Sequence, residues 1–280
     1  MKLLMSLGYD DPADAQIAAI QRWFADGLAT LGAAVAAELE QGPALNPASI
    51  RTDRDYGQPG QAWGQLSGGV GPFNRRPGVF VYSPANFDRL LRRWVPERMF
   101  EIQIRISRLD EQGRPHSITP VTLVSNHLDT DPNFLQLEAW CPDEWFTAAD
   151  YRAAALRWWR EIAEDISPTY GEVSNANYLR SGLEMDLGLS DQDTVPRGRD
   201  LLRGYSWLTI ASQEVGDRLG GVDALRASGA FQNVERLARG GFWLQATDEL
   251  ATYGAAQQAK VHSVLAPALP DASPSSLPNS

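Results

Sequence analysis

The sequence has a single cysteine, Cys141, among its 280 residues. One cysteine cannot form an internal disulfide, and a reducing compartment such as the cytoplasm fits this usage best. Cys141 lies between Trp140 and Pro142 with no histidine beside it, which favours a small core residue over a nucleophile. We therefore expect a cytoplasmic protein whose core needs no covalent cross-link.

Long apolar runs are also lacking. No uninterrupted apolar stretch approaches the ~20 residues that a membrane-spanning helix needs. Asp10 and Asp11 follow the short N-terminal apolar run too soon for a secretory signal peptide. We therefore expect no association with a membrane.

Positive charge is scarce, since 25 Lys and Arg residues face 35 Asp and Glu residues and leave a formal net charge of −10. Binding to a nucleic acid draws its affinity from lysine and arginine, so we expect no nucleic-acid partner. An acidic surface instead steers a basic protein into encounter. Simple solubility is the alternative explanation of the same charge.

The common catalytic motifs are missing as well. No Gly-x-Ser-x-Gly elbow and no Walker-type phosphate loop is present, and we expect neither an enzyme nor a bound cofactor. His127, Asp129 and Asp131 would supply imidazole and carboxylate ligands to a divalent metal if they pointed the same way. Because Asp-x-Asp-Pro-Asn is also an ordinary turn between strands, the metal-assisted enzyme is kept only as an alternative.

What the sequence does contain is a clear alternation of strand and helix patterns. Apolar alternation with a period of two predicts strands over 2–7, 78–82, 100–106, 118–124, 134–140, 205–211, 231–237 and 242–246. Helical spacing predicts helices over 11–39, 84–95, 147–166, 213–229 and 253–265. Thr147 with Asp150 is expected to form a capping box at the start of 147–166, and Ser212 is expected to cap 213–229. Gly220-Gly221 indicates a break into two short helices or a close backbone approach, and Gly240-Gly241 indicates a tight hairpin between the last two strands. We expect an α+β protein in which antiparallel sheet is covered by helices. The orders β-β-β-α and β-α-β-β-α suggest a weak pseudo-repeat.

The same pattern bears on the domain organisation. Residues 1–266 are expected to form a single α+β domain, with sub-units 1–168 and 200–266 joined by an irregular connection, 169–199, as the finer division. The Gly- and Pro-rich stretch 41–77 is expected to be an ordered insertion holding a short strand or two. The polar tail 267–280 is expected to be disordered.

Three short motifs in residues 203–247 resemble a known family. They are Arg203-Gly204-x-x-Trp207-Leu208-Thr209, Leu219-Gly220-Gly221-x-x-x-Leu225 and Gly240-Gly241-Phe242-Trp243-Leu244-Gln245-Ala246. This block is similar to the C-terminal signature of the type VI immunity family, whose members are bacterial proteins that neutralise secreted antibacterial toxins. The chain departs from the family after the hairpin, where Asp248-Glu249-Leu250 stands in place of a proline and a Gly-Asp pair.

The resemblance implies a cytoplasmic immunity protein that binds a toxin of type VI secretion and blocks it by stoichiometric occlusion. Charge complementarity would bring acidic loops to a basic toxin, and an exposed aromatic residue would supply an anchor. The candidate partner-binding residues are Asp129, Asp131, Glu184, Asp186, Asp191, Asp193 and Trp63. A structural subunit that pairs with another copy through a sheet edge is a further alternative, and the sequence does not predict the oligomeric state.

Overall fold

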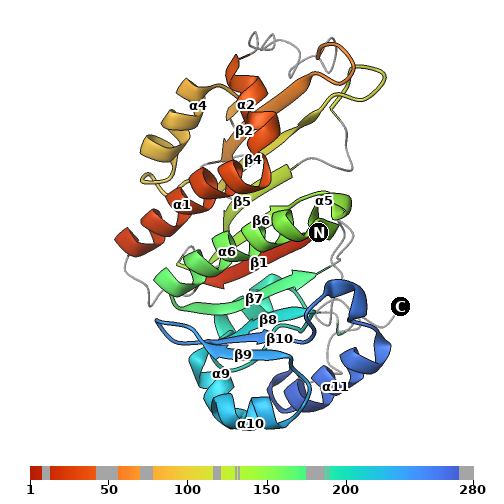
Figure 1. Ribbon diagram of the computed structural model, residues 1–280. Helices are drawn as coiled ribbons and strands as arrows, with labels where there is room; N and C mark the ends of the chain where they lie inside the picture. Colours follow the sequence, from red (N-terminus) through yellow and green to blue (C-terminus); the bar gives the residue numbers. More distant parts are fainter. Residues whose placement is uncertain are drawn as a thin grey trace, which may run out of the picture. The chain divides into compact units, whose positions relative to one another are not determined.

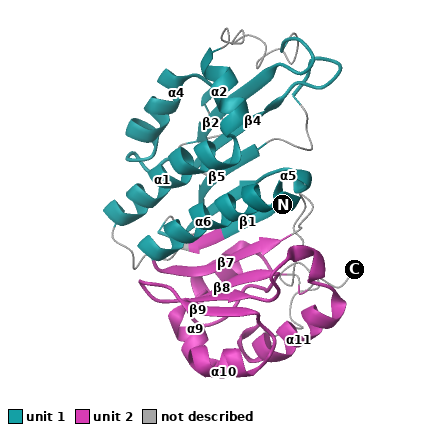
Figure 2. Ribbon diagram, viewed as in Figure 1, with its two compact units in different colours: residues 1–4, 9–166 teal, residues 5–8, 167–280 magenta. Residues whose placement is uncertain are grey.

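The computed structural model describes residues 1–7, 13–41, 56–69, 78–115, 121–129, 131, 133–174, 187 and 189–270. Two of the candidate residues, Glu184 and Asp186, lie outside these ranges. The chain divides into two compact units, one made of 1–4 and 9–166 and the other of 5–8 and 167–280 (Figure 2). The first strand therefore gives its opening residues to the first unit and its last residues to the second.

The first unit is built on an antiparallel sheet. Its strands are β1 (Lys2–Leu7), β2 (Ala62–Gly69), β3 (Gly78–Val81), β4 (Glu101–Arg108), β5 (Val121–His127) and β6 (Leu135–Trp140). They lie in the order β3-β2-β4-β5-β6-β1, and the pairs from β3 to β6 are antiparallel. The strand β2 confirms that the stretch 41–77 contains a strand.

Helices cover one face of this sheet. Ile102, Ile104 and Ile106 of β4 are buried on that face, while Gln103 and Arg105 between them are half-exposed on the other. The helices α1 (Ala13–Leu31) and α6 (Ala149–Asp165) lie side by side over the sheet (Figure 1). The rings of Trp23 and Trp158 join them, with centroids 4.5 Å apart and ring planes tilted by 40°.

The predicted helix 11–39 is two helices, α1 and α2 (Ala33–Gln41). The break falls at Gly32, where an added Cβ would overlap the side chain of Ile106. The predicted helix 84–95 is likewise divided, into α4 (Pro84–Arg89) and a π-helical turn, Leu90–Trp94. In both cases the helical spacing of apolar residues predicts the buried face. It does not predict the break at Gly32 or the π-helical turn.

The capping box expected at Thr147 and Asp150 is wrong. The hydroxyl of Thr147 donates to the carbonyl oxygen of Glu144 at 2.6 Å, at the end of the short helix α5 (Asp143–Thr147). The residue before α6 is Ala148, which offers no side-chain cap. Thr147 therefore ends one helix instead of beginning the next.

The second unit carries the strands β7 (Pro168–Ser174), β8 (Leu208–Ala211), β10 (Phe242–Gln245) and β9 (Asn233–Arg236), in that order and all antiparallel. Its helices are α8 (Asp191–Thr194), α9 (Gln213–Arg218), α10 (Gly221–Ala227) and α11 (Ala255–Leu265). Turns of 3-10 helix cover Val195–Arg197, Leu250–Thr252 and Ala266–Ala268. The strand β7 was not predicted, because its residues were assigned to the irregular connection.

Local signals in the block 203–247 are confirmed. Ser212 caps α9 by accepting the N–H of Val215 at 3.4 Å. Gly220 and Gly221, with φ of 95° and 73°, separate α9 from α10, and the hairpin between β9 and β10 turns at Gly240 and Gly241, each with φ of 96°. Such positive φ angles are accessible to glycine at little cost.

The expected fold class, mixed α and β with an antiparallel sheet covered by helices, is thus confirmed. The pseudo-repeat and the division into one domain or two stay predictions. At the C-terminal end, the carbonyl of Ala268 accepts the N–H of Leu202 at 2.7 Å, so residues just after 266 belong to the fold. The rest of the predicted tail, 271–280, lies outside the described residues.

We expect Gly216→Ala to lower the free energy of unfolding by about 2 kcal/mol. A Cβ at Gly216 would overlap the buried ring of Phe242, and this overpacking outweighs the ~1 kcal/mol that alanine gains over glycine in a helix. Chemical denaturation measures the change. Gly254→Ala, at a position with nothing within 4 Å of an added Cβ, is the control and should cost under about 1 kcal/mol. Equal effects would contradict this close packing.

Candidate partner-binding site

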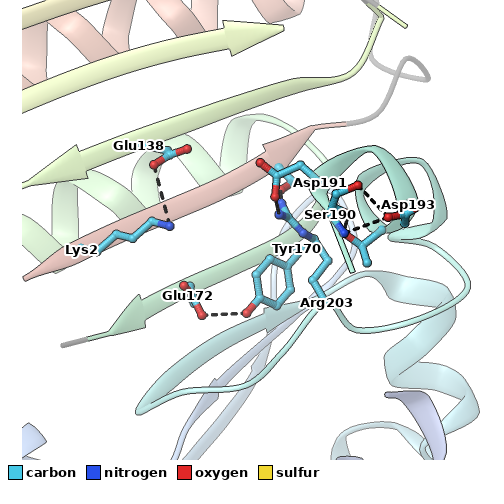
Figure 3. Close-up of polar contacts among 10 residues, drawn as sticks. Lys2, Glu138, Tyr170, Glu172, Ser190, Asp191, Asp193 and Arg203 are labelled. Carbon is cyan, nitrogen blue, oxygen red and sulfur yellow. Dashed lines mark hydrogen bonds and ion pairs between the residues drawn. The ribbon is translucent and has the colours of Figure 1, made fainter. Parts of the chain in front are cut away.

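The polar centre of the second unit is Arg203, whose side chain is only 3% exposed. One terminal nitrogen, Nη1, donates to the hydroxyl of Ser6 at 2.6 Å. The other, Nη2, donates to Oδ1 of Asp191 at 2.8 Å (Figure 3). A buried charge without a partner is strongly destabilising. The position of Asp191 is therefore coupled to the burial of Arg203.

An aromatic ring and a carboxylate extend this cluster. The guanidinium of Arg203 lies 5.6 Å from the ring centroid of Tyr170, within the range of a cation–π contact. The hydroxyl of Tyr170 donates to Oε2 of Glu172 at 2.9 Å (Figure 3). An added Cβ at Gly204 would lie 3.3 Å from the hydroxyl of Tyr170. In the first family-like motif, Arg203 thus places a positive charge over the ring of Tyr170, and Gly204 leaves room for the hydroxyl of Tyr170.

The helix α8 presents two of the predicted acidic residues. Ser190 precedes it in a capping box, where both the backbone N–H and the hydroxyl of Ser190 donate to Oδ2 of Asp193, at 2.8 and 2.6 Å. These bonds favour the ionised carboxylate: the hydroxyl of Ser190, and then its N–H, lower the pKa of Asp193 below its usual value. Asp193 is exposed and Asp191 is half-exposed. The structure therefore brings these two candidates together on one short, anchored segment.

The other described acidic candidates belong to the first unit. Asp129 is exposed, and Asp131 lies in the turn between β5 and β6. Oδ1 of Asp131 accepts from the N–H and the side-chain amide of Asn133, at 3.0 and 2.9 Å. This is the Asx turn that the sequence offered as the alternative to a metal ligand. Asp131 therefore holds the turn, while Asp129 is accessible.

The metal ligands of the alternative enzyme interpretation are not brought together. His127 is 3% exposed in β5, whereas Asp129 is exposed. Glu138, the acidic residue downstream, forms an ion pair with Lys2 at 3.8 Å (Figure 3). Among the residues that the structure describes, no group of three His, Cys, Asp or Glu side chains is placed to hold a metal ion. The described residues thus give the metal-assisted alternative no support.

Trp63 is not the exposed anchor that we expected. Its side chain is 2% exposed in β2 and packs with Tyr56, Val81 and Leu109. The ring of Tyr56 meets it edge-on, with centroids 6.2 Å apart. Burial satisfies the apolar surface of this tryptophan within the first unit.

In each of the two outer strands, β9 and β3, one backbone carbonyl already accepts a hydrogen bond from a side chain. The carbonyl of Val234 in β9 accepts from Nε and Nη2 of Arg226, at 3.1 and 2.8 Å. The carbonyl of Val81 in β3 accepts from Nδ2 of Asn86 at 2.9 Å. Such contacts blunt an edge strand as a template for another chain. They count against the alternative of self-assembly through a sheet edge.

Sequence reasoning missed Arg203, Tyr170 and Ser190 as site residues. Arg203 was part of the family-like block, but its partner Ser6 is 197 positions away in the chain. Tyr170 was missed with β7. Only Ser190 carried a local signal, since a serine three residues before an aspartate is a capping-box pattern.

The comparisons with known proteins give a likeness of fold. No family model and no curated protein matches the chain. Among solved structures, a type VI secretion system (T6SS) protein of Pseudomonas aeruginosa matches with a TM-score of 0.54 and 13% sequence identity. The match covers 96% of this chain and 72% of the other. In the described part of the chain, no helix is both long and apolar enough to span a bilayer.

We expect Arg203→Ala to lower the free energy of unfolding by about 3 kcal/mol or more, because it removes a buried hydrogen-bonded cation and leaves a cavity. The matched control is Arg199→Ala. Arg199 pairs with Glu214 at 3.1 Å nearer the surface, and its loss should cost under about 1 kcal/mol. If Arg203→Ala does not fold, Asp191→Asn tests the same ion pair at constant volume. A cost below that of Arg199→Ala, in Arg203→Ala or, where that variant does not fold, in Asp191→Asn, would contradict the anchoring role.

We expect Ser190→Ala to raise the pKa of Asp193 towards its ordinary value, because the variant lacks the hydroxyl that bonds the carboxylate. A group whose pKa is depressed by folding stabilises the fold above its unfolded pKa. This contribution is lost as the pH falls through the folded pKa. Carboxyl NMR titration of Asp193 in both proteins measures the shift. An unchanged Asp193 titration would show that the capping box is not formed in solution.

Proposed function

We propose that this chain is an immunity-type protein that binds a secreted antibacterial toxin of a T6SS and neutralises it by stoichiometric occlusion. The observation that carries the proposal is the likeness of fold, over 96% of the chain, to a T6SS protein of Pseudomonas aeruginosa. The family-like motifs of residues 203–247 support the same function independently of that likeness. They lie in a block that spans β8, α9, α10, β9 and β10, and all of these elements belong to the second unit.

The chemistry of the surface suits a basic protein partner. The net charge of −10 favours encounter with a cationic protein. Asp193 and Asp129 are exposed, and the hydroxyl and N–H of Ser190 lower the pKa of Asp193 below its ordinary value. In this account, Arg203 and Ser190 position the segment that carries Asp191 and Asp193. The toxin contacts the exposed carboxylates of the immunity protein. Occlusion needs no group of the protein to react.

Affinity capture of the tagged protein from its host, followed by mass spectrometry, identifies the partner. The expected result is one stoichiometric protein that is toxic when expressed alone and harmless when expressed with this chain. Capture of no such protein, together with no protection against toxins of the host's own T6SS, would overturn the proposal.

The acidic residues are then tested in the purified complex. We expect Asp129→Asn with Asp193→Asn to slow association several-fold at low salt, with a smaller difference at high salt, because exposed charges act mainly on the rate of encounter. Asparagine at 193 keeps an oxygen for Ser190. The control removes two charges from exposed positions elsewhere, Asp14→Asn with Glu40→Gln. Equal association rates for the two double variants would show that these carboxylates do not face the toxin.

A further inference from the structure

A hollow of about 360 Å³ opens in the second unit beside the turn after β10. Its walls come from three parts of the chain: Gly229, Phe231 and Gln232 between α10 and β9, residues 246–249 after β10, and Thr252 with Gln257 before and within α11. This volume lies at the lower end of the range for ligand pockets, about 300–1,000 Å³. A group the size of one long side chain fits such a hollow.

The hydrogen-bonding capacity of the walls is one-sided. The hydroxyls of Thr247 and Thr252 both donate to the carbonyl oxygen of Glu249, each at 2.7 Å. Nε2 of Gln257 donates hydrogen bonds to the carbonyl oxygens of Ala230 and Ala246, at 2.6 and 3.2 Å. The donors of these three side chains are therefore used, and their oxygens remain as acceptors. Gln232, which is exposed, is able to donate or accept.

The charged groups of the walls are both negative. Asp248 and Glu249 are exposed, and within the part of the chain that the structure describes neither carboxylate forms an ion pair. Two other surface acids of this unit have a basic partner: Glu214 pairs with Arg199, and Asp217 pairs with Arg236. None of the described residues that line the hollow is an arginine or a lysine. The two carboxylates thus add charge to a site whose other polar groups mostly accept.

The turn that carries these carboxylates is fixed before any ligand arrives. The carbonyl of Thr247 accepts from Nε1 of the buried Trp207 at 2.9 Å and from Nε2 of Gln245 at 3.0 Å. A site held in place by the core loses little conformational entropy on binding. The ring of Phe231 supplies an apolar wall against which the aliphatic part of a long side chain packs.

From these features we infer that the hollow binds one arginine or lysine side chain of the partner protein. Arginine has five donors and no acceptor, lysine has three donors and no acceptor, and both are cations, so each is complementary to walls of this kind. A phosphate or carboxylate ligand would face Asp248 and Glu249 with like charge. The inference rests on the proposed function for the identity of the partner, while the chemistry of the hollow stands on its own.

The test titrates the full-length protein with blocked tripeptides and follows its backbone and side-chain amides by NMR. A peptide with a central arginine should give saturable shifts centred on Asp248, Glu249 and the side-chain amide of Gln257. The same peptide with citrulline, which is neutral and nearly the same shape, should bind at least about tenfold more weakly, because it lacks the charge-assisted hydrogen bonds. The lysine and norleucine peptides form a second pair.

The matched variants are Asp248→Asn with Glu249→Gln, which keep the shape of the turn, and Asp14→Asn with Glu40→Gln, which remove the same charge from the first unit. The first pair should weaken the arginine peptide about tenfold or more, and the second pair should leave its affinity unchanged. Absence of saturable shifts, equal binding of arginine and citrulline peptides, or equal affinities of the two double variants would each overturn the inference. A protein that protects cells but fails here keeps its proposed function and loses this site.

Discussion

The second unit depends on the burial of one positive charge. Arg203 is 3% exposed and is stabilised in that position by Ser6, Asp191 and the ring of Tyr170. Removing such a charge from water costs several kcal/mol, which only good geometry and several partners offset. Ser6 lies in β1 and Asp191 begins α8, so the guanidinium connects β1, the segment before β8 and the ring of Tyr170 in β7. The short helix α8, which carries the exposed Asp193, is thereby held in place.

The parts of the fold that sequence predicts are those governed by local periodicity. The alternating isoleucines of β4, the serine cap of α9 and the paired glycines of the β9–β10 hairpin each act within a few residues, and each is confirmed. The strand β7 was missed because Pro168, Gly171 and Glu172 disguise its alternation, and the strand is recognised only by its pairing with β8. The break at Gly32 depends on Ile106, which is far away in the sequence.

The site was harder to predict than the fold. Acidic residues were recognised by type, but type alone did not separate Asp131, which holds its own turn, from Asp193, which is exposed on a capped helix. Trp63 was misjudged because a tryptophan among glycines carries no local sign of the Tyr56, Val81 and Leu109 side chains that bury it. Asp248 and Glu249 were recorded only as a departure from the family pattern. Their relation to Gln257 and Phe231 arises from tertiary packing.

Occlusion and enzymatic inactivation differ in stoichiometry, and this difference tests the account most directly. The measurement is residual toxin activity as the purified protein is titrated against a fixed amount of its captured toxin. Occlusion predicts a linear fall that ends at equimolar protein, with no dependence on the time of preincubation once binding is complete. Full protection by a small fraction of an equivalent, increasing with time, would mean that the protein turns over the toxin or its product, and would contradict the account.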